Sequence, residues 1–336
     1  MSQKVKRALI TGITGQDGSY LTEFLLSQGY EVHGLVRRTS TLERSRLRPL
    51  FADPEIHGRR LFLHYCDLED TTTLRRILVR ITPEELYHLA GQSHVGLSFE
   101  IAESTVDSVA IATLRLLEIL QDLAVPPRLF HAASSEIFGR PRQVPQDENS
   151  PMVPVNPYGA AKAFAANLVR IYREKHGLFL VNGILYNHES PRRGENFVTR
   201  KICRAAAAIK LGKQESLSLG DTSAQRDWGD ARDYVRGMWL ALQHSQPEDF
   251  IFATGVLHTV QDVVEAAFCE VGLDWNAHVR RDERLLRSQE PFALVGNAAK
   301  AERLLSWHPS RSLQKLIHWM VDAELELLAG ESLVAA

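Results

Sequence analysis

The sequence has few cysteines and no long apolar segment. Its 336 residues include three cysteines, Cys66, Cys203 and Cys269. Because their number is odd and their spacing does not match a metal site, we expect reduced thiols, a reducing compartment and no bound metal. No apolar stretch approaches the roughly 20 residues that cross a bilayer, and the apolar run after the basic N-terminus is too short for a signal peptide. These absences predict a cytoplasmic protein.

The sequence also lacks an excess of charge of either sign. The formal net charge is -2 at pH 7, which provides no general attraction to nucleic acid or to an anionic membrane. Any phosphate must therefore be bound by a few local side chains. Hydrophobic residues make up 44% of the chain and charged residues 24%, which is typical of a globular protein. The length favours a core domain with a second lobe.

Short apolar runs alternate with amphipathic segments through the first half of the chain. Strands are predicted at 8–11, 31–36, 61–65, 85–89, 128–133 and 179–185, and helices at 20–28, 106–121 and 158–176. This alternation is typical of an α/β fold with a doubly wound parallel sheet, the Rossmann arrangement. We expect residues 1–185, with a return of 225–255, to form this domain. Residues 186–224 and 256–336 are expected to form mainly a smaller α/β substrate-binding lobe.

Three glycines separate the first predicted strand from the first predicted helix. Gly12, Gly15 and Gly18 are spaced three residues apart. Small residues there let the backbone approach a pyrophosphate, which free amides and the helix dipole then hold. A glycine-rich turn without a ligand is the alternative, and the strand before the turn favours a dinucleotide. The same turn contributes three further candidate cofactor residues, Thr14, Gln16 and Asp17.

Two arginines follow the second predicted strand. An NAD enzyme usually presents a carboxylate at this place, so Arg37 and Arg38 favour the 2′-phosphate of NADP. A solvated basic loop is the alternative interpretation of this pair. After the third strand, Asp67 and Leu68 are expected beside the adenine of the cofactor, and a helix N-cap by Asp67 is the alternative.

A tyrosine and a lysine lie four residues apart in the predicted helix over 158–176. Tyr158 and Lys162 share one helix face, and a nearby cation lowers the proton affinity of a phenol. Tyr158 is therefore predicted to take a proton from a sugar hydroxyl while a hydride leaves for nicotinamide. Ser134 and Glu136 follow a strand and are expected in the same cleft, where the carboxylate indicates proton abstraction or elimination. The alternatives are a capped strand end for Ser134 and an ion-paired surface acid for Glu136.

Several segments together resemble the GDP-mannose 4,6-dehydratase family of the extended short-chain dehydrogenase/reductase superfamily. The resemblance rests on residues 12–21, 92–95, 134–136, 158–162, 187–194, 197–201 and 226–229. It covers nearly the whole chain and is most specific over 187–201. A member of this family is expected to be a lyase of nucleotide-sugar metabolism that acts in deoxysugar biosynthesis.

The resemblance implies a sequence of internal redox steps. A hydride leaves C4 of the mannose for NADP, and Glu136 then removes the C5 proton that the new carbonyl has made acidic. Water leaves from C6 and the hydride returns to C6, which yields GDP-4-keto-6-deoxy-mannose. The implied roles are a base at O4 for Tyr158, a hydrogen bond to O4 for Ser134, and for Lys162 an electrostatic partner and ribose anchor.

The resemblance also implies which residues hold the GDP-sugar. Asn187, Lys201 and Arg226 match family positions that bind the GDP portion, and a diphosphate suits such donors. The implied substrate-binding set is completed by Ser93, Glu189, Arg287 and Glu290. A solvated loop or a subunit contact is the alternative for the charged pairs at 192–193 and 200–201. Family members form dimers or tetramers, so a homodimer or homotetramer is expected, with the loop over 37–46 reaching a neighbouring subunit's cofactor.

Two departures from the family pattern leave the sugar open. Ser134 stands where threonine is usual, which keeps the hydroxyl, and the residues beside Arg287 and Glu290 differ from the usual flanks. A GDP-linked manno-heptose is therefore an alternative substrate. A nucleotide-sugar epimerase or 4-ketoreductase would share the tyrosine and lysine, but Glu136 argues against both. An NADP-binding scaffold without activity is disfavoured because all four catalytic candidates are present.

Overall fold

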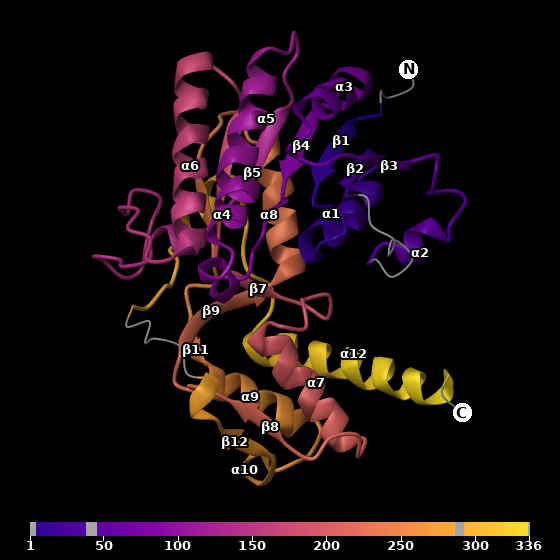
Figure 1. Cartoon of the computed structure of the whole chain (residues 1–336), viewed down its shortest axis with the longest axis vertical. Coiled ribbons are helices and arrows are strands. Elements are labelled where there is room, and N and C mark those ends of the chain that lie inside the picture. Colours follow the sequence, from indigo (N-terminus) through magenta and orange to yellow (C-terminus); the bar gives the residue numbers. More distant parts are fainter. Residues whose placement is uncertain (1–4, 38–45, 286–291, 335–336) are drawn as a thin grey trace.

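The structure is a computed structural model that describes residues 5–37, 46–285 and 292–334. The larger of its two lobes, in the upper part of Figure 1, is built on a parallel sheet. Among the described residues this sheet has seven strands, in the order β10-β6-β5-β4-β1-β2-β3. They are β1 (Arg7–Thr11), β2 (Glu31–Val36), β3 (Leu61–Tyr65), β4 (Glu85–His88), β5 (Arg128–Ser134), β6 (Leu180–Leu185) and β10 (Phe250–Phe252). The predicted doubly wound parallel sheet is confirmed, and the six predicted strands end within one residue of the observed bounds.

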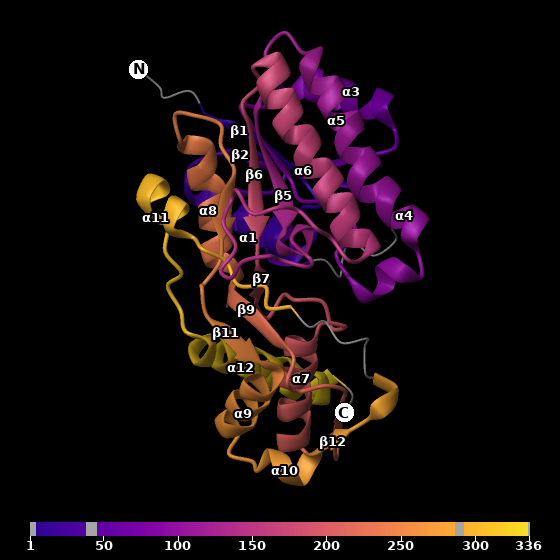
Figure 2. The same ribbon diagram turned by 90° about the vertical axis from the view of Figure 1, so that its left-hand side faces the viewer.

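Helices cover both faces of this sheet, as Figure 2 shows from the side. One face carries α3 (Thr71–Ile81), α5 (Ala112–Gln121) and α6 (Pro157–His176), and the other carries α1 (Gln16–Ser27) and α8 (Ala231–Gln243). The helix predicted over 106–121 belongs to a longer helical run, because α4 (Ala102–Val106) and a π-helical turn (Asp107–Ile111) precede α5. The remaining short elements of this lobe are α2 (Arg48–Phe51), η2 (Gly96–Phe99), η4 (Ser135–Ile137) and α11 (Ala299–Leu305).

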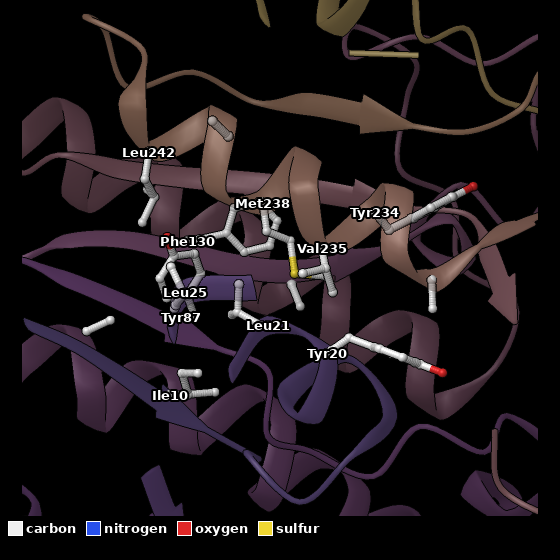
Figure 3. Packing of buried hydrophobic residues seen from close by; sticks show 14 of the residues in the cluster. Ile10, Tyr20, Leu21, Leu25, Tyr87, Phe130, Tyr234, Val235, Met238 and Leu242 are labelled. Carbon is white, nitrogen blue, oxygen red and sulfur yellow. The ribbon is translucent and has the colours of Figure 1, made fainter. Parts of the chain in front are cut away.

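The main core lies between the sheet and the helix pair α1 and α8. Figure 3 shows Leu21 and Leu25 of α1 beside Val235, Met238 and Leu242 of α8. All five side chains are fully buried or nearly so. Each such aliphatic side chain contributes about 1.5–3 kcal/mol through removal of its apolar surface from water. This packing holds the first turn of α1 at the edge of the sheet where the parallel strands end.

The helix that carries two candidate catalytic residues has clear signals at both ends. The side chain of Asn156 accepts a hydrogen bond from the amide of Gly159, and Pro157 occupies the first helical position of α6. The helix ends at Gly177, whose φ of 64° suits a left-handed C-cap. Because the helix starts at 157, Tyr158 lies in its first turn, next to the carboxyl ends of the strands.

The smaller lobe lies beyond the carboxyl ends of the parallel strands, in the lower part of Figure 1. Its described strands form two small sheets, ordered β11-β9-β7 and β12-β8. The strands are β7 (Asn187–Glu189), β8 (Leu217–Leu219), β9 (Gln225–Asp230), β11 (Leu257–Thr259) and β12 (Val279–Arg281). The other elements are α7 (Val198–Lys210), α9 (Val260–Glu270), α10 (Trp275–His278), η5 (Glu283–Leu285) and α12 (Leu313–Val334), and α7, α9 and α12 share a second core. Within the described ranges, every helix is too short or too polar to span a membrane.

The chain passes between the lobes through residues 225–255. β9 belongs to a sheet of the smaller lobe, and the α8 and β10 that follow it pack into the larger lobe. The buried carboxylate of Asp227 accepts hydrogen bonds from the amides of Thr254, Gly255 and Gly296. These bonds hold three separate segments together at the boundary, so the position of β9 relative to the parallel sheet is well defined.

Candidate active site

The glycine turn after β1 is as compact as its sequence predicts. Gly12 has a φ of 72°, and a Cβ there would lie 2.9 Å from the backbone of Ala90. A Cβ on Gly18 would lie 2.4 Å from the carbonyl oxygen of Gly12, so α1 packs directly on the turn. The N-cap of α1 is Gly15, and no side chain caps the helix. The amides of the first helical turn therefore remain available for an anion, and the helix dipole favours one.

A cavity of about 870 Å³ lies at the carboxyl ends of the parallel strands. This size is at the upper end of the range for ligand pockets. It is lined by fifteen of the residues that the sequence singles out: Gly12, Thr14, Gly15, Gln16, Asp17, Gly18, Arg37, Asp67, Leu68, Ser93, Ser134, Glu136, Tyr158, Lys162 and Asn187. Residues far apart in the chain thus meet around one space.

The lining residues fit a nicotinamide dinucleotide along the length of the cavity. Arg37 follows β2, the glycine turn follows β1 and Ser134 ends β5, so these groups are spread over the neighbouring strands β2, β1, β4 and β5. Three interstrand steps of about 4.8 Å span roughly 14 Å, which suits an extended ligand. Arg37 offers a cation for a phosphate at one end. Arg38, its predicted partner, lies outside the described residues.

The turn after β3 corrects one interpretation of Asp67. Asp70, and not Asp67, caps α3, and its carboxylate accepts a hydrogen bond from the amide of Thr73 at 2.9 Å. The N-cap alternative for Asp67 is therefore wrong, because the helix begins one turn later than that interpretation requires. Asp67 and Leu68 both line the cavity on the side of Arg37.

The four candidate catalytic residues meet at the end of β5. Tyr158 is hydrogen-bonded to Ser134. The carboxylate of Glu136, in the turn after β5, accepts a hydrogen bond from the side-chain amide of Asn156 at 2.8 Å. The Lys162 ammonium donates to the carbonyl oxygen of Ala132 at 2.6 Å and lies 5.9 Å from the centre of the Tyr158 ring.

Burial dominates the acid–base state of the tyrosine and the lysine. Burial raises the pKa of Tyr158 to about 12, against the opposing hydrogen bond from Ser134. Burial also lowers the pKa of Lys162 to about 8, and the charge of Asp17 only partly opposes that shift. The sequence suggests that the lysine lowers the proton affinity of the phenol, but here the loss of water around the phenol outweighs it.

An ion pair between His188 and Asp17, in the first turn of α1, was not predicted from the sequence. His188 Nε2 lies 2.9 Å from the Asp17 carboxylate, and Nδ1 donates to the carbonyl oxygen of Tyr186. The imidazole also stacks on Tyr234, with ring centres 4.6 Å apart. Burial would lower the pKa of His188, but the charge of Asp17 and their hydrogen bond outweigh burial and raise it. The same pair lowers the pKa of Asp17 although burial opposes this.

Six of the seven predicted substrate residues fall into three groups. Ser93 and Asn187 line the cavity. Lys201 and Arg226 project from α7 and β9 outside its lining; the Lys201 ammonium donates to the carbonyl oxygen of Ser218, and the Arg226 guanidinium to that of Gln225. Arg287 and Glu290 lie outside the described residues.

Glu189 differs from the expectation that it contacts the sugar nucleotide. Its carboxylate is buried, accepts a hydrogen bond from the Thr199 hydroxyl at 2.5 Å and pairs with the Arg193 guanidinium at 3.2 Å. Strand alternation does not explain the difference, because residues two apart in a strand share a face. The Thr199 hydroxyl and the Arg193 guanidinium hold the Glu189 carboxylate away from the cavity, whereas Asn187 lines it. Arg193, which the sequence leaves as a solvated or subunit-contact residue, instead lines the cavity and packs on the Phe197 ring. No local sequence pattern marks this contact, because residues 191–197 form turns, in which spacing along the chain does not fix which side chains meet.

Comparison with known proteins agrees with this geometry. A family model described as GDP-mannose 4,6 dehydratase matches residues 9–320. The GDP-mannose 4,6 dehydratase 1 of Arabidopsis thaliana is 50% identical over 335 residues, which cover 98% of this chain and 92% of that protein. The GDP-mannose 4,6-dehydratase of Sinorhizobium fredii is 46% identical over 344 residues, which cover 97% of this chain and 98% of that protein.

Solved structures share the fold over nearly the whole chain. A dTDP-glucose 4,6-dehydratase from Streptomyces venezuelae, solved with NAD bound, has a TM-score of 0.83 and 26% identity, and the match covers 96% of this chain and 98% of that chain. RMD from Pseudomonas aeruginosa, complexed with NADPH, has a TM-score of 0.79 and 20% identity over 96% of this chain and 100% of that chain. At that identity the second likeness concerns the fold alone.

Proposed function

The chain belongs to the GDP-mannose 4,6-dehydratase family, and on that premise we propose that it removes water from GDP-mannose with NADP as an internal hydride carrier. The product is GDP-4-keto-6-deoxy-mannose, so the enzyme is a hydro-lyase. One observation carries the proposal: the hydroxyl of Ser134, the phenol of Tyr158, the ammonium of Lys162 and the carboxylate of Glu136 line the same cavity as the glycine turn.

The first half of the reaction oxidises C4. When bound, NADP supplies the hydride acceptor for C4 and the hydride that C6 later receives. Because the pKa of Tyr158 is about 12, its phenolate is the minor form near pH 7, and this form takes the proton from O4. Ser134, hydrogen-bonded to Tyr158, orients the same hydroxyl. Lys162 adds a positive charge beside the phenol, and its pKa of about 8 leaves most of it charged at pH 7.

The second half of the reaction removes water across C5 and C6. The new C4 carbonyl makes the C5 proton acidic, and Glu136 accepts it. The electron pair of the C5–H bond forms the C5–C6 double bond as the C6–O bond breaks, and Glu136 returns the proton to the departing hydroxyl, which leaves as water. With NADP bound, C6 would then receive the stored hydride, and C5 would receive the proton that Tyr158 took from O4, which restores the C5–H bond of the product. A carboxylate in this place distinguishes elimination from simple oxidation and reduction.

The GDP portion is proposed to extend from this site towards the smaller lobe. Ser93, Asn187 and Arg193 line the cavity, Asn187 and Arg193 come from the segment that enters the smaller lobe, and the Arg193 guanidinium suits a diphosphate. We assign Lys201 and Arg226 to the nucleotide end, because α7 and β9 lie in the smaller lobe. In this division residues 1–185 hold the cofactor together with α8 and β10 of the expected return over 225–255, whereas β9 at the start of that return joins 186–224 and 256–336, which mainly hold the sugar nucleotide.

Three finer assignments accompany the proposal. The preference for NADP rests on Arg37, which lines the cavity after β2 where a carboxylate would favour NAD. We propose a homodimer or homotetramer, supported by exposed apolar side chains on the outer helices, among them Phe164 and Ile171 of α6 and Val106 of α4. We propose a cytoplasmic location, which suits three free cysteines.

Replacement of Glu136 by glutamine tests the proposal. We expect purified wild-type protein with NADP to convert GDP-mannose into a product one water lighter, measured by mass spectrometry. Glu136→Gln is expected to bind NADP normally, to lower the rate of water loss at least a hundredfold and to stop exchange of the C5 proton with deuterated solvent. Glu174→Gln, an exposed acid on α6, removes the same charge as a control. Undiminished water loss in Glu136→Gln would refute the assigned chemistry.

A further inference from the structure

The start of α6 packs directly against the turn that carries Glu136. A Cβ on Gly159 would lie 2.5 Å from the carbonyl oxygen of Glu136, so no side chain separates the two segments. Two side-chain contacts cross this junction. Tyr158 is hydrogen-bonded to Ser134, and Asn156 donates to the Oε2 atom of Glu136.

The orientation of the Asn156 side chain is determined by its two partners. The amide of Gly159 is a donor and lies 2.7 Å from Oδ1, so this atom must be the side-chain carbonyl oxygen. The NH₂ group therefore faces the Glu136 carboxylate, at 2.8 Å. Asn156 is 8% exposed, so little water competes for either bond.

Helix capping alone does not explain an asparagine at this position. Serine, threonine and aspartate also supply the oxygen that an N-cap needs. Asparagine differs from them in one respect that matters here, because it adds an amide donor on the opposite side of the same group. That donor points at a proposed catalytic carboxylate.

We infer that Asn156 is a positioning residue, which holds the Glu136 carboxylate aimed at C5 of the sugar. A hydrogen bond to a carboxylate restricts its rotation. Proton removal from C5 needs this orientation, whereas hydride loss from C4 depends on Tyr158 and Lys162. The inference rests on the proposed function and adds a residue that ties the geometry of the elimination step to the first turn of α6.

Two substitutions separate the two roles of Asn156. Asn156→Ser keeps a capping oxygen but has no donor that reaches Glu136, and Asn156→Asp keeps the size and the cap but replaces the donor by an acceptor. Asn167→Ser makes the same change at an exposed position of the same helix and serves as the control. Melting temperature and NADP binding are expected to match the wild type in the serine variant.

The readouts follow the two halves of the reaction separately. We expect both Asn156 variants to slow C5 exchange and water loss roughly tenfold to a hundredfold, while C4 oxidation proceeds near the wild-type rate. The near-ultraviolet absorbance of reduced nicotinamide should then accumulate during turnover. A mere structural disturbance would slow both halves and leave no such signal.

Three other outcomes would overturn the inference. If both variants exchange the C5 proton at the wild-type rate, the amide donor of Asn156 does not matter. If C4 oxidation and C5 exchange fall equally, Asn156 serves only as the N-cap of α6. In either case the proposed function still stands if the wild type removes water from GDP-mannose and Glu136→Gln does not. If Glu136→Gln itself exchanges C5 normally, the proposed function fails and the role of Asn156 falls with it.

Discussion

Replacement of Lys162 by methionine should make the protein more stable and inactive at once. Burial lowers the pKa of this lysine from its ordinary 10.5 to about 8. At about 1.4 kcal/mol for each pH unit, keeping the ammonium charged in the folded protein costs about 3 kcal/mol at pH 7. Methionine fills a similar space without a charge, but loses the hydrogen bond to Ala132, worth about 1 kcal/mol. We therefore expect Lys162→Met to raise the free energy of unfolding by about 2 kcal/mol at pH 7.

The stability advantage of Lys162→Met over the wild type should shrink as the pH rises. The folded pKa of Lys162 lies below the unfolded value, so between the two values the unfolded chain binds more protons, and wild-type stability rises with pH. Between pH 7 and about pH 9.5, Lys162 should raise the free energy of unfolding of the wild type by about 2 kcal/mol, whereas that of Lys162→Met should gain nothing from this group. The advantage of the variant should therefore vanish near pH 9.5.

Urea unfolding of cofactor-free protein, followed by circular dichroism at both pH values, measures these differences. Lys175→Met, an exposed lysine near the end of the same helix, is the control and should change stability little at either pH. A Lys162→Met protein that is less stable than the wild type at pH 7, or whose advantage is the same at both pH values, would refute the reasoning. In a separate assay without urea and with NADP added, turnover of GDP-mannose should be lost in Lys162→Met at both pH values.

Two further predictions concern the cofactor end of the cavity. Gly18→Ala should weaken NADP binding at least tenfold in calorimetry, because its Cβ would lie 2.4 Å from the Gly12 carbonyl oxygen; Ser27→Ala on the same helix should bind normally. His188→Asn should lower the melting temperature more at pH 6 than at pH 9. The His188 pKa is raised and the Asp17 pKa lowered, so the pair stabilises fully between about 3.8 and 6.5 and loses its effect as pH rises through the folded pKa of His188. An equal loss at both pH values would contradict this assignment.

The parallel sheet could be predicted because its signals are local. Short apolar runs bounded by turn residues gave strands within one residue of the observed bounds, and β10 escaped because its three residues are too short for a periodic pattern. The positions just after strands could be chosen as functional because parallel strands end at one edge of a sheet. For this reason the sequence alone predicts that the glycine turn, Ser134 and Glu136 lie at the same place.

Residues whose role depends on side-chain direction could not be predicted in the same way. The asparagine before Pro157 predicts a helix cap, but its second bond requires the distance to Glu136, 20 residues earlier. Arg193 and Glu189 lie in one charged segment, and sequence alone does not decide which of them faces the cavity. The packing of Arg193 on Phe197 and the burial of Glu189 decide it.

The sequence by itself determined the type of sheet, the glycine turn and the kinds of chemical group in the site, because periodicity and residue type are properties of neighbours along the chain. Only the tertiary structure decided which protonation states those groups favour. Tyr158 and Lys162 share a helix face in any helix, but segments distant in sequence remove water from both and move the pKa of the phenol up and that of the ammonium down. Desolvation depends on everything packed around a group, so it enters only when the chain has folded.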